Sequence, residues 1–502
     1  MVRVTGGGVA VSPPTRNLGG RAARGAAVTV AGQGTRILVQ VLSVVVLSRL
    51  LAPRDYGLLA MVTAVIGIAD IFRDLGLSTA AIQARVLTDR QRANLFWINT
   101  GLGATLTVAA FCLSPTLAAF YDQPELVEIG RVLAFTFLLN GLATQYRADL
   151  NRRLRFGWLS LADVVAALAG FGVAVVMALG GAGYWSLVGQ QLTQYGLMLA
   201  LVVAGARWWP RPPSRGADMG GLLRFGWHMV GTQVIGYVAN NADSVVVGAR
   251  FGAGPLGLYN RAFQLLMTPL GQVRGPTTQV ALPVLSAIQD DDERFAGYVR
   301  TGQLALGYTL VAGLGLALGA APELVAVLLG AEWQAAAPFL GFFALAGALQ
   351  TLGLVNYWVY LSRGLTRELF RYSLIQAAVK IACILVGSQW GVLGVAAGYA
   401  LAPALTWPLS FWWVARSTSL AVRPLVAGAV RVLLLFVGVA LAGRGAGTLV
   451  QGAPDWAALA VAVVGGVLAY GLLTAAVGPM RRDLVVVRSV LRRALQRRGV
   501  TA

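Results

Sequence analysis

Several arginines lie inside the long apolar runs of this chain, where a positive charge needs a carboxylate partner or an anionic ligand. Arg36 and Arg274 are far from the ends of their runs, and Arg73, Arg49 and Arg250 accompany them. A guanidinium group binds the oxygens of an anion through two parallel hydrogen bonds. Ionisable side chains at membrane depth face a wet interior or pair with one another. These residues therefore indicate either an anion-binding site within a membrane or a set of internal ion pairs.

Polar neighbours leave both roles open. Gln33, Gln40 and Ser43 share a helical stripe with Arg36 and would keep it hydrated. Carboxylates in the same runs could instead neutralise the arginines, or bind an ion or act in gating. The candidate substrate-binding residues are Arg36, Arg274, Arg73, Arg49, Arg250, Gln33, Gln40, Asn240 and Asn241, and the candidate ion-binding or gating residues are Asp70, Asp74 and Asp243.

The segment around Arg274 is rich in residues that interrupt helices. Residues 268–276 read TPLGQVRGP. These prolines and glycines should break the eighth apolar run, which is too long for one straight helix. A half-helix exposed at membrane depth would direct the positive end of its dipole at an anion. We therefore expect a helix break beside Arg274.

Catalytic and metal-binding motifs are missing from the sequence. It contains no HExxH, no GxxxxGK[ST], and one histidine, His228, which lies outside the probable core positions of a catalytic triad. Asp70 and Asp74 could form a carboxylate pair, but Arg73 lies between them, so a neutralised cluster is the simpler interpretation. We expect no catalytic residue, no metal and no cofactor, and leave coupling to a proton or sodium gradient open.

Composition shows which elements must position these residues. The 502 residues are 57% hydrophobic and 12% charged, with a mean hydropathy of +0.69. This composition predicts an all-α polytopic membrane protein, and counting apolar runs of spanning length gives about 14 transmembrane helices. The net charge of +20 is almost wholly arginine, with Lys380 the only lysine. In a membrane protein such charge reports orientation, so nucleic acid is not an expected partner.

The loops differ in charge on the two sides of the predicted bundle. Arginines follow the even-numbered runs and fill both terminal segments, whereas the opposite loops carry mostly acidic residues. By the positive-inside rule both termini are cytoplasmic. The arginine-rich C-terminal segment has apolar residues at near-helical spacing, which predicts an amphipathic helix on the anionic inner leaflet.

The first two runs recur later in the chain. Residues 43–46 and Arg49 match residues 244–247 and Arg250 at an offset of about 201, and Arg73 matches Arg274. Such an offset contains six spans and predicts two pseudo-symmetric six-helix lobes followed by a helical hairpin. The predicted organisation is a disordered tail (1–25), an N-lobe (26–206), a cytoplasmic linker (207–224), a C-lobe (225–415), helices 13 and 14 (416–480) and a basic amphipathic tail (481–502).

Four motifs in these runs resemble a known family. They are Leu51-Ala52-Pro53-Arg54-Asp55-Tyr56-Gly57-Leu58, Asp74-Leu75-Gly76-Leu77-Ser78, Gly183-Tyr184-Trp185-Ser186-Leu187-Val188 and Gly391-Val392-Leu393-Gly394-Val395-Ala396-Ala397-Gly398-Tyr399. Over residues 25–415 the chain resembles the bacterial polysaccharide flippases of the multidrug/oligosaccharidyl-lipid/polysaccharide exporter superfamily.

The resemblance implies a multi-pass protein of the bacterial inner membrane. Such proteins move undecaprenyl-diphosphate-linked oligosaccharides to the outer leaflet for lipopolysaccharide, capsule or exopolysaccharide synthesis, by alternating access of two lobes around a cationic cavity. The implied partners are that lipid-linked substrate, membrane lipid, and polysaccharide polymerase or glycosyltransferase proteins. We expect a monomer.

Two other functions remain open. A multidrug exporter, or an exporter of another lipid-linked precursor, would share the superfamily, although a multidrug cation antiporter would need an acidic cavity. A membrane-embedded oligosaccharide polymerase or ligase would be an enzyme, and would need a larger outer loop than the sequence provides. The pattern of buried cations favours the flippase.

Overall fold

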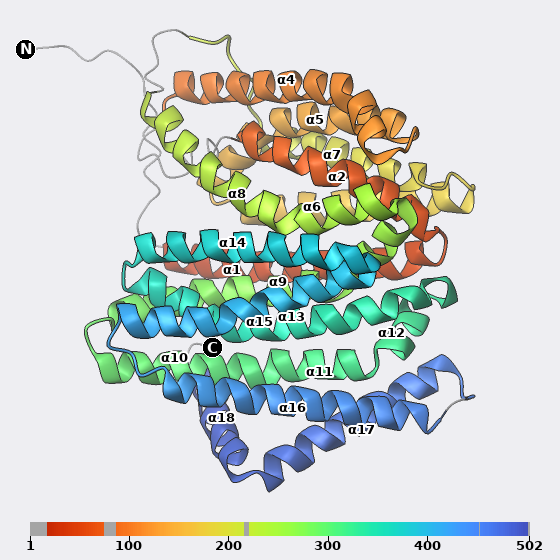
Figure 1. Ribbon diagram of the computed structural model, residues 1–502. Helices are drawn as coiled ribbons and strands as arrows, with labels where there is room; N and C mark the ends of the chain where they lie inside the picture. Colours follow the sequence, from red (N-terminus) through yellow and green to blue (C-terminus); the bar gives the residue numbers. More distant parts are fainter. Residues whose placement is uncertain (1–17, 75–86, 215–219, 451, 500–502) are drawn as a thin grey trace, which may run out of the picture. The chain divides into compact units, whose positions relative to one another are not determined.

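A computed structural model describes the chain over residues 18–74, 87–214, 220–450 and 452–499. Within these ranges its side chains are described over 32–67, 87–214, 236–450 and 452–488. All regular elements in the described chain are helices (Figure 1), which confirms the predicted all-α class. Nine helical stretches in the described part are long and apolar enough to cross a membrane. The protein is therefore a multi-pass membrane protein, but the predicted count of fourteen spans is not confirmed.

The described chain divides into two compact units, residues 1–257 and 258–502. The predicted lobe boundaries on either side of the 207–224 linker stay a prediction. The helices of the first unit are α1 (Leu18–Ser48), α2 (Pro53–Asp74), α4 (Asp89–Tyr121), α5 (Leu126–Arg152), α6 (Phe156–Leu179), α7 (Trp185–Ala206) and α8 (Gly220–Phe251). The first of them begins inside the segment predicted as a tail.

Helix pairs in the first unit pack through small residues. The largest contacts join α4 to α5, α6 to α7, α1 to α6 and α2 to α8. A side-chain carbon added at Gly103 of α4 would lie 2.6 Å from the carbonyl oxygen of Phe137, and one at Gly141 of α5 would lie 2.6 Å from that of Asn99. Small residues let transmembrane helices approach backbone to backbone, which gives van der Waals contact where no hydrophobic driving force separates helix from lipid.

The second unit contains the remaining helices. They are α9 (Ala253–Ala287), which begins in the first unit, α10 (Asp292–Leu306), the π-helix η2 (Gly307–Val311), α11 (Ala312–Gly319), α12 (Ala321–Leu328), η3 (Ala331–Ala336), α13 (Ala337–Ser362), α14 (Thr366–Gly387), η4 (Ser388–Trp390), α15 (Gly391–Ser417), α16 (Arg423–Thr448), α17 (Asp455–Ala476) and α18 (Gly478–Gly499).

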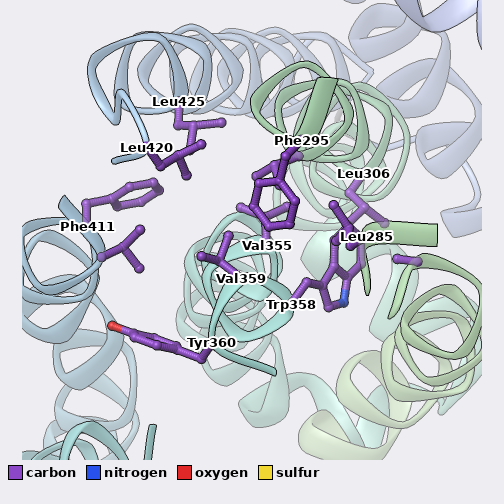
Figure 2. Packing of buried hydrophobic residues seen from close by; sticks show 13 residues of the cluster. Leu285, Phe295, Leu306, Val355, Trp358, Val359, Tyr360, Phe411, Leu420 and Leu425 are labelled. Atoms are coloured by element: carbon purple, nitrogen blue, oxygen red, sulfur yellow. The ribbon is translucent and has the colours of Figure 1, made fainter. Parts of the chain in front are cut away.

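The core of the second unit forms around α13. Figure 2 shows Val355, Trp358 and Val359 of this helix surrounded by residues of neighbouring helices, among them Phe295 of α10 and Phe411 of α15. Most of α13 is buried, consistent with a helix that is apolar on all sides. The indole of Trp358 also donates to Thr278 Oγ1 of α9 at 3.0 Å, so α13 holds α9 in place.

The predicted break in the eighth run is wrong, because α9 is continuous from Ala253 to Ala287. Pro269, Pro276 and Pro283 all lie inside it. They are seven residues apart and exposed, so the backbone groups that they leave unpaired share one face and the rest of the hydrogen-bond ladder continues. The hydroxyls of Thr277 and Thr278 donate to the carbonyl oxygens of Val273 and Arg274 at 2.8 and 3.0 Å. No half-helix terminus is therefore available beside Arg274.

The C-terminal hairpin packs closely on the rest of the second unit. In Figure 1, α16 runs beside α10 and α11, and α18 turns back from the end of α17. Carbons added at Gly315 and Gly319 of α11 would lie 2.8 and 2.6 Å from the carbonyl oxygens of Phe436 and Ala440 of α16. The two glycines form a GxxxG pair that allows this approach. The hairpin is thus an integral part of the second unit.

Candidate functional site

The polar stripe of α1 lies on the surface of the first unit. Gln33, Arg36 and Gln40 are exposed, whereas Ser43 is half-buried and accepts a hydrogen bond from Gln190 Nε2 of α7 at 3.1 Å. The exposed apolar residue Leu38 lies on roughly the opposite side of the helix by its periodicity. A helix with one apolar and one polar exposed face suits a boundary between lipid and a wet interior. The structure thus keeps together the stripe that the sequence predicts.

Arg49 and Arg250 lie at helix ends. Arg49 follows the last residue of α1, and Arg250 is in the last turn of α8. Both side chains are exposed. A cation at a helix C-terminus is stabilised by the negative end of the helix dipole. This environment accounts for the two arginines without a ligand, and places them away from the middle of their helices.

The polar residues of α8 differ in their surroundings. Asn240 is exposed, and Asn241 is half-buried and donates from Nδ2 to the carbonyl oxygen of Tyr237 at 2.9 Å. Asp243 is buried, with only 2% of its surface exposed. The hydroxyl of Tyr237 in turn donates to the carbonyl oxygen of Thr63 at 3.1 Å, which links α8 to α2. A buried carboxylate in this polar segment fits the predicted role in ion binding or gating, which stays a prediction.

The remaining candidates of the first unit fall on undescribed side chains. Asp70, Arg73 and Asp74 belong to the last part of α2, of which only the backbone is described. The same holds for His228 in α8. Their predicted roles stay predictions.

Arg274 is the central cation of the second unit. It is half-buried in the interior of α9, where Nη1 donates to Gln350 Oε1 at 3.3 Å and Nη2 to the Gln350 carbonyl oxygen at 3.4 Å. Both acceptors are neutral, and within the described part of the second unit Arg274 forms no ion pair. Carbons added at Gly271 or Gly275 would meet nothing within 4 Å, so the helix surface beside Arg274 is open. The geometry leaves a positive charge in the helix interior that an anion could approach.

A second cation lies near Arg274. Lys380 Nζ of α14 lies 4.6 Å from the centre of the Tyr399 ring of α15, within the range of a cation–π interaction. Tyr399 also interacts electrostatically with Arg274, and packs edge-on against Phe263 and Phe343. The tyrosine is therefore shared by two cations from different helices. Among the described residues this is the best-defined cationic site.

Our list of candidate residues did not contain Lys380, Tyr399 and Gln350. The signal for Lys380 was present, because it is the only lysine of the chain and lies in an apolar run. Gln350 and Tyr399 carry no charge, so only packing could associate them with Arg274. The list also omitted Arg261, which has only 6% of its surface exposed and donates from Nη1 to Gln264 Oε1 at 3.1 Å.

Two of the sequence motifs meet in the first unit as a structural clamp. Asp55 Oδ2 accepts a hydrogen bond from the Ala52 amide at 3.0 Å, and the carboxylate also accepts one from the Tyr184 amide. Gly183, with a φ of +54°, lies beside the same carboxylate. Burial raises the pKa of Asp55, and the two amide donors and Arg54 oppose that rise. These motif residues therefore shape a turn and do not line a ligand site.

Comparison with known proteins follows from this architecture. Residues 46–338, more than half of the chain, match the family described as polysaccharide biosynthesis protein. This chain belongs to that family. The resemblance seen in the sequence is thereby confirmed.

Curated relatives extend over most of the chain. It is similar to the lipopolysaccharide biosynthesis protein WzxC of Escherichia coli (strain K12), with 26% identity over 73% of this chain and 75% of that protein. It is also similar to the teichuronic acid biosynthesis protein TuaB of Bacillus subtilis (strain 168), with 28% identity over 69% and 72%. The succinoglycan biosynthesis transport protein ExoT of Rhizobium meliloti (strain 1021) is 24% identical over 70% and 71%.

Solved structures share the fold. The lipid II flippase MurJ in an inward closed conformation superposes with a TM-score of 0.70 at 12% identity, covering 91% of this chain and 99% of that one. An inward-facing multidrug resistance transporter of the MATE family gives 0.57 at 14% identity, covering 80% and 95%. The fold of this family member is thus that of all-helical membrane transporters.

Proposed function

We propose that this protein is a flippase that moves undecaprenyl-diphosphate-linked oligosaccharide from the inner to the outer leaflet of the plasma membrane. It would work by alternating access and supply cell-surface polysaccharide synthesis. The family match and the names of the relatives, which refer to polysaccharide biosynthesis and transport, support a transporter rather than an enzyme. The topology follows the arginine asymmetry of the loops, with both termini in the cytoplasm.

The environment of Arg274 carries the proposal. A guanidinium in the interior of a membrane helix normally has a carboxylate partner, because an uncompensated charge there is costly. Arg274 instead has an amide and a backbone carbonyl as partners, and Lys380 approaches the same tyrosine. Two cations with neutral partners suit a ligand that brings its own negative charges. A diphosphate group does so.

The exposed stripe of α1 provides the matching feature of the first unit. Arg36, with Gln33 and Gln40 on either side, offers a hydrated guanidinium on a helix that is apolar on its other exposed face. A diphosphate carries about two negative charges and needs cations that replace its water before it can cross hydrocarbon. We infer that Arg36 and Arg274 each bind the diphosphate during transport.

Transport by reconstituted protein tests the proposal. Purified full-length protein in vesicles would receive undecaprenyl-diphosphate oligosaccharide, and the fraction exposed in each leaflet would be measured with an impermeant sugar-modifying reagent. We expect Arg274→Gln to slow flipping by ~30-fold or more, because truncating one partner of a desolvated charge pair costs about 2–5 kcal/mol. Arg274→Lys should retain part of the activity, since it keeps the charge but loses the planar fork.

A matched control separates ligand binding from folding. Arg211→Gln removes an exposed arginine of the segment after α7 and should leave flipping unchanged. If Arg274→Gln and Arg36→Gln both flip at the normal rate, the cationic-site mechanism is wrong. Failure of the unmodified protein to move this lipid, together with movement of a cationic dye, would favour the multidrug alternative. A dependence on an imposed proton or sodium gradient would establish the coupling that the sequence leaves open.

A further inference from the structure

The C-terminal helix α18 contains a buried carboxylate that the transport site does not use. Asp483 has only 2% of its surface exposed. Its Oδ2 accepts hydrogen bonds from Arg431 Nε of α16 at 2.7 Å and from the Tyr308 hydroxyl of η2 at 3.3 Å, while Oδ1 lies 3.7 Å from Arg300 Nη2 of α10. We call these four residues the Asp483 latch. It joins α18 to three other elements of the second unit.

The latch sets the rotation of α18 about its axis. Met480, Asp483 and Val487 are buried and recur at helical spacing, so they form the face that packs on the unit. Any rotation would remove Asp483 from its donors and leave a buried carboxylate without compensation, which is strongly unfavourable. The Tyr308 carbonyl oxygen accepts a hydrogen bond from the Tyr470 hydroxyl of α17 at 3.2 Å, so the helix before α18 is tied to the same point.

The opposite face of α18 is exposed and basic. Arg481, Arg482 and Arg488 are exposed, together with Val485. The whole helix contains seven arginines and one acidic residue, Asp483, whose charge is neutralised inside the latch. The surface that α18 presents is therefore purely cationic in its described part.

The membrane surface is the partner that this location favours. Only Val477 separates α18 from α17, which is long and apolar enough to span the membrane. The exposed arginines thus begin where a transmembrane helix ends, at the level of lipid headgroups. Positive side chains at this level attract anionic phospholipids, an interaction that salt screens.

We propose that α18 is a binding surface for anionic phospholipid headgroups, and that Asp483 is the positioning residue that turns its arginines toward them. This goes beyond anchorage by an amphipathic tail, because the orientation of the basic face depends on an ion-pair network in the folded unit. It is also independent of which lipid-linked sugar the protein carries.

A fluorescent reporter on α18 tests the proposal in the full-length protein. Cys112 and Cys383 would be replaced by alanine, and an environment-sensitive dye attached through Val485→Cys, an exposed position on the basic face. The protein would be placed in nanodiscs of phosphatidylcholine, with or without phosphatidylglycerol. We expect a blue shift of the dye only when phosphatidylglycerol is present, and its reversal by high salt. Arg481→Gln, Arg482→Gln and Arg488→Gln together should abolish the shift.

The variant Asp483→Asn distinguishes positioning from bulk charge. It makes α18 more positive, so simple electrostatic attraction predicts a larger shift, whereas the latch predicts loss of the shift because the face is no longer held. Tyr308→Phe removes one contact without changing any charge, and should reduce the shift; it decides the question if Asp483→Asn does not fold. A blue shift in phosphatidylcholine alone, no shift in either lipid, or a larger shift in Asp483→Asn would each overturn the proposal.

Discussion

Gly57 and Gly257 lie against each other's helix starts in a reciprocal arrangement. A side-chain carbon at Gly57 of α2 would overlap the carbonyl oxygen of Ala253, and one at Gly257 of α9 would overlap that of Pro53. The positions differ by 200 residues in both pairs, close to the repeat offset seen in the sequence. Such reciprocity is typical of a contact across a two-fold axis between duplicated segments. The contact supports the duplication, which stays a prediction until the repeats are superposed.

Substitution of Gly57 tests how tightly this contact is packed. We expect Gly57→Ala to lower the free energy of unfolding by ~3 kcal/mol, because the added methyl group must displace a backbone oxygen. Gly254→Ala, in the same turn of α9, has nothing within 4 Å of the added carbon and should be neutral or slightly stabilising. Thermal unfolding of the purified proteins would compare them. Equal midpoints for the two variants would contradict the packing.

Lys380 should contribute to transport through its charge. Lys380→Met removes the cation near Tyr399 and is expected to reduce flipping by ~10-fold while leaving the amount of protein in the membrane unchanged. Lys380→Arg keeps the positive charge and should retain most of the activity. The measurement is the leaflet assay described above. Normal flipping by Lys380→Met would show that this lysine only packs against the aromatic cluster.

The Asp483 latch makes a separate prediction about stability. Asp483→Ala leaves Arg431 without its carboxylate in a largely buried position, and we expect a loss of about 3 kcal/mol in the free energy of unfolding. The double variant Asp483→Ala with Arg431→Met should recover part of this loss, since both charges are removed together. Unfolding in detergent would be followed for all members of the cycle. Strictly additive losses would mean that the pair is not coupled.

The glycine pair of α11 should decide whether the C-terminal hairpin stays packed. We expect Gly319→Val to separate α16 from α11, because a branched side chain cannot fit against the Ala440 carbonyl oxygen. Faster proteolysis near Gly452, between α16 and α17, would report the separation. Gly313→Val is the control, since a carbon added at Gly313 meets nothing within 4 Å. Equal cleavage rates in the two variants would refute this role.

The orientation of the protein can be tested with reporter fusions. A reporter placed after Gly452 should be active outside the cytoplasm, and one placed after Ala502 should be active inside, because arginines gather on the side of the termini. Reversal of the two signals would invert the topology. It would also place α18 at the outer leaflet, where the proposed anionic partner is scarcer.

The sequence by itself determined the class of the protein and the position of its charges. Apolar runs of spanning length predict transmembrane helices because backbone groups in hydrocarbon must be paired within the helix. The same reasoning placed Arg36 and Arg274 inside helices. The motif around Asp55 and Gly57 was recognised from the sequence, but only the structure showed that its residues form a turn clamp.

Tertiary structure decided what the charges contact. Local propensity predicted a break at the prolines of α9, yet the helix continues, because its prolines lie on one exposed face and α13 supports the helix through Trp358. Gln350 and Tyr399 became neighbours of Arg274 only through packing, since neutral residues on separate helices leave no pattern in the chain. Asp483 appeared in the sequence as one acidic residue in a basic tail. Its burial between Arg431 and Tyr308 depends on helices far apart in sequence, and periodicity along one helix does not contain that information.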